Sequence, residues 1–116
     1  MDGELSFFEI GTGDPERAAA FYSELFGWRF EPTGGGARIE TPSVPGGIHG
    51  GDAGASPYVF FAVGDLDVAL EQVRSLGGSG DAMDEDPDTV REFGRFALCK
   101  DDQGSGFGLH QQPARS

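Results

Sequence analysis

Glu9 is the residue of this chain whose surroundings most favour chemistry. It lies in the run Phe7-Phe8-Glu9-Ile10, which alternates as a half-buried strand does, with Phe7 and Glu9 on one face. A carboxylate on an aromatic wall loses water, which raises its pKa unless a partner holds the charge. Removing that water is costly, so a role in stability alone is hard to justify. We therefore expect Glu9 to bind a ligand or to act as a general base, with a partner among His49, His110, Arg38 and Arg95.

Three other features resemble functional sites but favour structural roles. Cys99 has no base near it in the sequence and lies in an expected strand, which indicates a buried, inert thiol. Gly11 and Gly13 precede a helix as in a dinucleotide-binding loop, but Glu16 stands where the third glycine belongs. The acidic run 81–88 lacks the ligand spacing and the sixth-position glycine of a calcium loop, so we expect a solvated loop there.

Length and charge restrict the class of protein. The 116 residues suffice for one compact domain, or for two small repeats that share a core. A formal net charge of −12 argues against nucleic acid or an anionic membrane as a partner, because both require a basic surface. One cysteine cannot form an internal disulfide, and neither a signal peptide nor a membrane span is recognisable. We therefore expect a cytoplasmic protein.

The first half of the chain reads as strand, helix and three further strands. Asp14-Pro15-Glu16 is a helix start, and an apolar stripe with helical spacing then runs to Phe26. Gly27 is expected to end the helix. Strands follow at 28–30, 37–41 and 47–51, separated by turns rich in glycine and proline.

The second half repeats this pattern. A strand at 57–63 leads to a helix over 65–76, which Gly77-Gly78 should stop. Residues 79–92 are expected to form a loop, and strands are expected at 94–100 and 105–111. Asp14 and Asp65 occupy the same place in the two halves, at an offset of 51 residues, and Gly27 and Gly78 share that offset. The chain is thus one domain, 1–116, built from pseudo-repeats 1–52 and 56–112.

The motif at the first helix carries a family resemblance. Asp14-Pro15, Arg17-Ala18, Phe21-Tyr22 and Leu25-Phe26-Gly27-Trp28 together resemble the first module of the vicinal-oxygen-chelate superfamily, which includes glyoxalase I, bleomycin-resistance proteins and extradiol dioxygenases. The small glyoxalase-like branch is the most similar. The resemblance implies an α+β fold in which two βαβββ modules form an open, cup-shaped mixed sheet with helices outside. It also implies a homodimer.

The resemblance also bears on metal binding. In metal-using members, four strands each present one ligand, and these positions fall here on Phe7, His49, Val59 and Gly108. Three of the four have no donor atom for a metal. The resemblance therefore implies that the ordinary glyoxalase metal site is absent and that no cofactor is required.

An alternative metal site remains open in the same strands. Glu9 and His110 each follow a lost ligand position by two residues, so each shares a strand face with it. With His49 they could form a set of two histidines and one carboxylate for a divalent metal.

The favoured function is metal-independent binding of a small aromatic or amphipathic molecule in the cup. The alternative is a lyase- or isomerase-type enzyme with Glu9 as general base, with or without that metal. A third reading is a partner subunit with no ligand of its own. The residues expected to contact the ligand are Phe7, Glu9, Trp28, Arg38, His49, Val59, Phe61, Arg95 and His110.

Overall fold

The structure, a computed structural model, describes residues 2–114 and has the expected α+β fold. The chain divides into two compact units: an N-terminal unit of residues 7–59, and a C-terminal unit of residues 60–114 with the first few residues of the chain. Strands β1 (Leu5–Gly11) and β5 (Tyr58–Ala62) each contribute to both units. No helix in the described part of the chain is long and apolar enough to span a bilayer.

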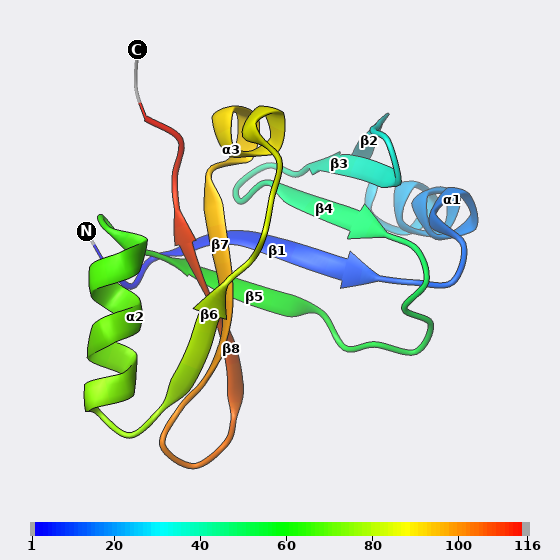
Figure 1. The fold of residues 1–116 in the computed structure, drawn as a ribbon. Coiled ribbons are helices and arrows are strands. Elements are labelled where there is room, and N and C mark those ends of the chain that lie inside the picture. The colour runs from blue at the N-terminus through cyan, green and yellow to red at the C-terminus, as the bar shows by residue number, and fades with distance from the viewer. Residues whose placement is uncertain (1, 115–116) are drawn as a thin grey trace. The chain divides into compact units, whose positions relative to one another are not determined.

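The N-terminal unit packs one helix on one face of its strands (Figure 1). In helix α1 (Pro15–Phe26), Asp14 accepts a hydrogen bond from the backbone N–H of Arg17, and Gly27 ends the helix at a φ of 76°. The helix lies against β2 (Arg29–Pro32), β3 (Gly36–Glu40) and β4 (Gly46–His49). The core beneath it is formed by Ile10, Ile39 and Ile48, with Phe8, Tyr22 and Trp28 packed around them.

The strand register of this unit decides which side chains share the other face. The strand order is β2-β3-β4-β1, with β1 parallel to β4. Ile10 pairs with Ile48 in the helix-covered core, so the neighbouring pairs Glu9–Gly47 and Gly11–His49 face away from the helix. The predicted division of β1 into an Ile10 face and a Glu9 face is thus confirmed.

The C-terminal unit repeats this arrangement. Helix α2 (Leu66–Ser75) is capped by Asp65 and lies against β6 (Ser79–Ala82), β7 (Arg95–Lys100) and β8 (Gly106–Gln111) (Figure 1). The strand order is β5-β8-β7-β6, and β5 is parallel to β8. Its core consists of Leu66, Leu70, Ala97, Cys99 and Leu109.

The duplication extends to individual strand pairs. Gly11–His49 in the first unit corresponds to Ala62–His110 in the second, and Glu9–Gly47 corresponds to Phe60–Gly108. The two histidines of the chain are therefore equivalent positions of the repeat. The expected modules are confirmed at this level of detail.

One expectation for the second half was wrong. Residues 79–92 are not one loop, because Ser79–Ala82 pairs with β7 and Pro87–Phe93 forms helix α3. The helix starts at Asp86-Pro87, the same cap as Asp14-Pro15, and its acidic surroundings concealed that signal. The expected stop at Gly77-Gly78 is confirmed, with Gly77 as the left-handed residue after α2 at a φ of 96°. A β-carbon added at Gly78 would lie 2.5 Å from the Lys100 carbonyl oxygen, so this glycine allows the backbone of β7 to approach closely.

Candidate functional site

Glu9 and His49 meet on the open face of the N-terminal unit. Glu9 Oε2 lies 2.7 Å from Nδ1 of the His49 ring, although the two residues are 40 positions apart in the chain. The parallel pairing of β1 with β4 brings them together, since it places His49 opposite Gly11, next to Glu9 on the same face. The Glu9 side chain is 24% exposed and that of His49 is 37% exposed, so the pair is accessible from solvent.

Asp52 and Tyr58 extend this pair into a network of four side chains. Asp52 Oδ2 lies 2.9 Å from His49 Nε2 and accepts a hydrogen bond from the Tyr58 hydroxyl at 2.8 Å. The backbone holds Asp52 in place, because Thr12 N–H donates to the His49 carbonyl and Asp52 N–H donates to the Thr12 carbonyl. The segment after β4 is thereby tied to the loop after β1.

The proton on His49 is determined by its two neighbours. Ionised carboxylates only accept hydrogen bonds, so a ring with a carboxylate at each nitrogen must donate from both and is an imidazolium. Burial alone lowers the pKa of His49, but the hydrogen bonds and charges of Glu9 and Asp52 outweigh it and raise that pKa. Burial raises the pKa of Glu9, and the bond to His49 partly opposes this. The hydrogen bonds from His49 and Tyr58 lower the pKa of Asp52.

Two glycines leave the space in which the carboxylates lie. A β-carbon added at Gly47 would be 2.5 Å from Glu9 Oε1, and one added at Gly11 would be 2.2 Å from Asp52 Oδ2. Neither contact is possible for a real β-carbon, so any side chain at these positions would displace its carboxylate.

His110 has a different environment although it is the repeat equivalent of His49. It is 3% exposed and stacks on Phe96 with 4.4 Å between ring centroids. Its Nε2–H donates to the Phe93 carbonyl at 2.6 Å, so Nδ1 accepts from the Ser6 hydroxyl at 2.8 Å. Burial lowers the pKa of His110, and the bond to Phe93 only partly opposes this. His110 is therefore a buried, neutral ring.

The three residues of the alternative metal site do not fit a metal as they are arranged. Both nitrogens of His49 face carboxylates, and both nitrogens of His110 are in hydrogen bonds of the C-terminal unit. Within residues 2–114, no group of three or more histidine, cysteine, aspartate or glutamate side chains is arranged to hold a metal ion.

The other expected ligand residues lie in several places. Arg38 is half-buried and pairs in register with Gly47, so it shares the face of Glu9. Phe7 lies on that face too and is 6% exposed. Arg95 is held by Asp67 through contacts of 3.1 and 3.3 Å. Phe61 pairs with Leu109 of the core beneath α2, which places Phe61 and its strand neighbour Val59 on the face opposite to Phe60.

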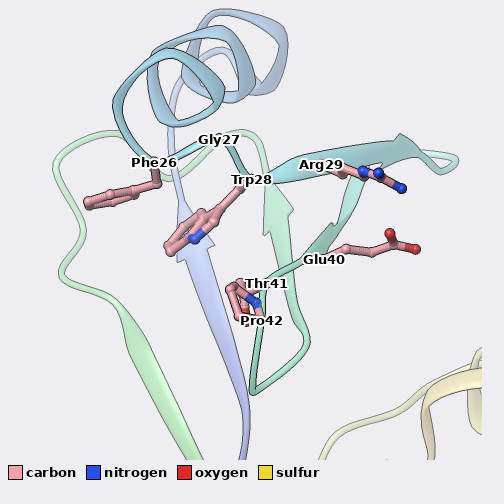
Figure 2. Close-up of a pocket in the computed structure, with 7 residues that line it drawn as sticks. All are labelled: Phe26, Gly27, Trp28, Arg29, Glu40, Thr41 and Pro42. Carbon is pink, nitrogen blue, oxygen red and sulfur yellow. The ribbon is translucent and has the colours of Figure 1, made fainter.

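Trp28 lies on the helix side of the N-terminal unit, next to a surface hollow. Its ring is 4.8 Å from that of Phe26 and 5.6 Å from that of Tyr22. Figure 2 shows both Phe26 and Trp28 at this hollow, with Arg29 and Glu40 side by side at the other end. The hollow has about 300 Å³ of space and is lined by Phe26, Gly27, Trp28, Arg29, Glu40, Thr41 and Pro42.

Sequence reasoning missed Asp52 and Tyr58. Asp52 follows the strand expected at 47–51 and Tyr58 lies in the strand expected at 57–63, but neither is among the residues expected to contact the ligand. The available signal was the spacing His49-x-x-Asp52 after a glycine-rich strand, with a tyrosine at the start of the next strand. Spacing alone does not show that the linker folds back onto β1.

The two histidines should titrate on opposite sides of the ordinary histidine pKa of about 6.5. We expect a higher value for His49, which lies between two carboxylates, and a lower one for His110, which is buried. The stability that His49 contributes is present below the ordinary histidine pKa and is lost as pH rises through the raised pKa of His49. The stability that His110 contributes is present above the ordinary pKa and is lost as pH falls through the lowered pKa of His110. NMR of the ring nitrogens measures both. Asp52→Asn should lower only the His49 value, and two values below 6.5 would contradict the arrangement.

Gly47→Ala should disrupt the site while leaving the fold intact. The added β-carbon displaces Glu9 Oε1, which weakens the bond between Glu9 and His49. We expect the pKa of His49 to fall toward about 6.5. Gly35→Ala is the matched control, because its β-carbon would meet nothing within 4 Å. An unchanged His49 titration in folded Gly47→Ala protein would show that the glycine is not needed.

Comparison with known proteins agrees with this architecture. A Didymella fabae protein named "Glyoxylase-like domain-containing protein" is 33% identical over 93 residues, covering 67% of this chain and 71% of that protein. The anthracycline biosynthesis protein DauV of Streptomyces sp. (strain C5) is 28% identical over 130 residues, covering 92% of this chain and 46% of that protein. The chain thus spans about half the length of DauV.

Solved structures show the same fold. A variant of Streptomyces coelicolor methylmalonyl-CoA epimerase, in complex with 2-nitronate-propionyl-CoA, has a TM-score of 0.71 and 14% identity, covering 98% of this chain and 100% of that chain. At 14% identity, this similarity shows only that the two chains share a fold. The sequence profile of the glyoxalase-like domain matches residues 7–110. The chain therefore belongs to the glyoxalase-like domain family, in agreement with the family resemblance of its first helix.

Proposed function

We propose that this glyoxalase-like protein binds a small organic molecule, without a metal, on the face of β1 and β4 that carries Glu9 and His49. The observation that carries the proposal is the network of Glu9, His49, Asp52 and Tyr58. The apolar core of the unit lies on the opposite face, under α1. The network is thus not required to fill the core, and its side chains are partly exposed.

The cost of assembling this network supports a functional role. Two carboxylates and an imidazolium lose part of their hydration on a sheet face, and such groups rarely stabilise a fold more than apolar residues of similar volume would. The repeat provides a comparison, since the position equivalent to Glu9 is the buried Phe60. The same strand position can therefore be filled by an apolar side chain.

The names of relatives also support a small-molecule ligand. One relative is named for anthracycline biosynthesis, and structural neighbours are epimerases in complex with coenzyme A esters.

A second candidate function is an isomerase- or lyase-type enzyme with Glu9 as general base. Burial raises the pKa of Glu9, which makes its carboxylate a stronger base than an exposed one. Glu9 Oε2 is bound by His49, while Oε1 lies over Gly47. A proton taken by Oε1 would thus reach a carboxylate that His49 holds in place. Turnover of a bound ligand that Glu9→Gln abolishes would favour this candidate over binding alone.

Glu9→Gln tests the proposed function. We expect the variant to remain folded, with an unfolding free energy within about 1 kcal/mol of the wild type, because the lost ion pair is partly exposed. Affinity for a ligand found by screening should fall about tenfold or more, as for a lost hydrogen bond to a charged group. Thermal unfolding with and without the ligand measures both. Glu24→Gln, on the exposed side of α1, is the control for loss of one charge. If Glu9→Gln unfolds the protein while affinity per folded molecule is unchanged, Glu9 is structural.

We also propose that the chain forms a homodimer through α1. Three large apolar side chains of this helix, Phe21, Leu25 and Phe26, are 61%, 58% and 57% exposed. Such a group on a helix face is typical of a surface that another chain covers. Sedimentation at tens of micromolar, roughly the range in which weak dimers persist, should show a dimer that Leu25→Lys dissociates. A wild-type monomer there would contradict the proposal.

A further inference from the structure

The hydrogen bonds within the network use all of its donors. Both ring N–H groups of His49 donate to carboxylates, and the Tyr58 hydroxyl donates to Asp52. A ligand that reaches this face therefore finds no donor available from His49 or Tyr58 unless an internal bond breaks. Breaking one would leave a partly buried carboxylate without its partner, which is unfavourable.

The network still offers acceptors. Glu9 uses Oε2 for His49, and Asp52 uses Oδ2 for both His49 and Tyr58, so Glu9 Oε1 and Asp52 Oδ1 remain for a ligand. Two carboxylates and one imidazolium give the network a net charge of −1. The whole chain carries −12, which adds an attraction for cations.

We infer that the ligand of this site is a hydrogen-bond donor with a positive charge, such as a protonated amine, amidine or guanidine, and not a carboxylate or phosphate. The inference rests on the proposed function and narrows it to a ligand class. A cationic donor would add bonds to Glu9 Oε1 and Asp52 Oδ1 without disturbing His49. An anion would instead meet two like charges.

Arg38 is the charged group that would work against this inference. Arg38 in β3 and Glu9 in β1 pair with Gly47 from its two sides, so both charged side chains project from the same sheet face. If Arg38 rather than the carboxylates recognised the ligand, anions would be preferred and Arg38→Gln would abolish their binding. The two recognition modes are thus separable by experiment.

The test uses three aromatic probes of similar size and different charge: benzamidine, benzamide and benzoate. Each is titrated into the full chain at fixed ionic strength, up to about 10 mM, while NMR follows the signals of Glu9, His49 and Tyr58. We expect benzamidine to bind at least about tenfold more tightly than benzoate, as a charge-assisted hydrogen bond predicts. Glu9→Gln and Asp52→Asn should each weaken benzamidine about tenfold, whereas Glu24→Gln should leave its affinity unchanged.

The outcomes separate the ligand class from the proposed function. The cationic ligand class is overturned if benzoate binds at these residues more tightly than benzamidine and loses affinity in Arg38→Gln. That result would still support the proposed site. If the affinity for benzamidine falls equally in Glu24→Gln, binding depends only on the overall charge of the chain, and the inference is also overturned. Absence of any change at Glu9, His49 and Tyr58 with all three probes contradicts both the ligand class and the site.

Discussion

The imidazolium of His49 between two carboxylates is the interaction on which the rest of the site depends. Without its positive charge, Glu9 and Asp52 would be two partly buried anions on one sheet face with no cation between them. The backbone positions the side chains that make this contact. The parallel register of β1 and β4 sets the position of His49, and the Thr12 bonds hold Asp52 beside it.

The internal repeat shows how one scaffold supports two different environments. Glu9 lies opposite Gly47 of β4 in the first unit, and Phe60 lies opposite Gly108 of β8 in the second. Both glycines leave room for the side chain that they face. The equivalent histidines follow the same division. His49 is partly exposed and held as a cation, whereas His110 is buried, stacked on Phe96 and neutral. A polar network therefore occupies these positions in one repeat, and apolar packing occupies them in the other.

Much of the fold could be predicted from the sequence because its signals are local. The cap at Asp14-Pro15, the glycine stop at Gly27 and the offset to Asp65 each depend on a few adjacent residues. The site was predictable only in part. Glu9 and its face followed from strand alternation, but its choice of His49 over His110 or an arginine depends on strand register. Asp52 and Tyr58 join the site because a linker folds back onto β1, which no local pattern encodes.

The most direct test of cation recognition at Glu9 is a crystal structure of the protein with a bound amidine. We expect the amidine to lie over β1 and β4, with a nitrogen about 3 Å from Glu9 Oε1. The bonds from Glu9 and Asp52 to His49 should be unchanged in the complex. An amidine found in the hollow beside Trp28, or one that displaces His49 from Glu9, would contradict this mode of recognition.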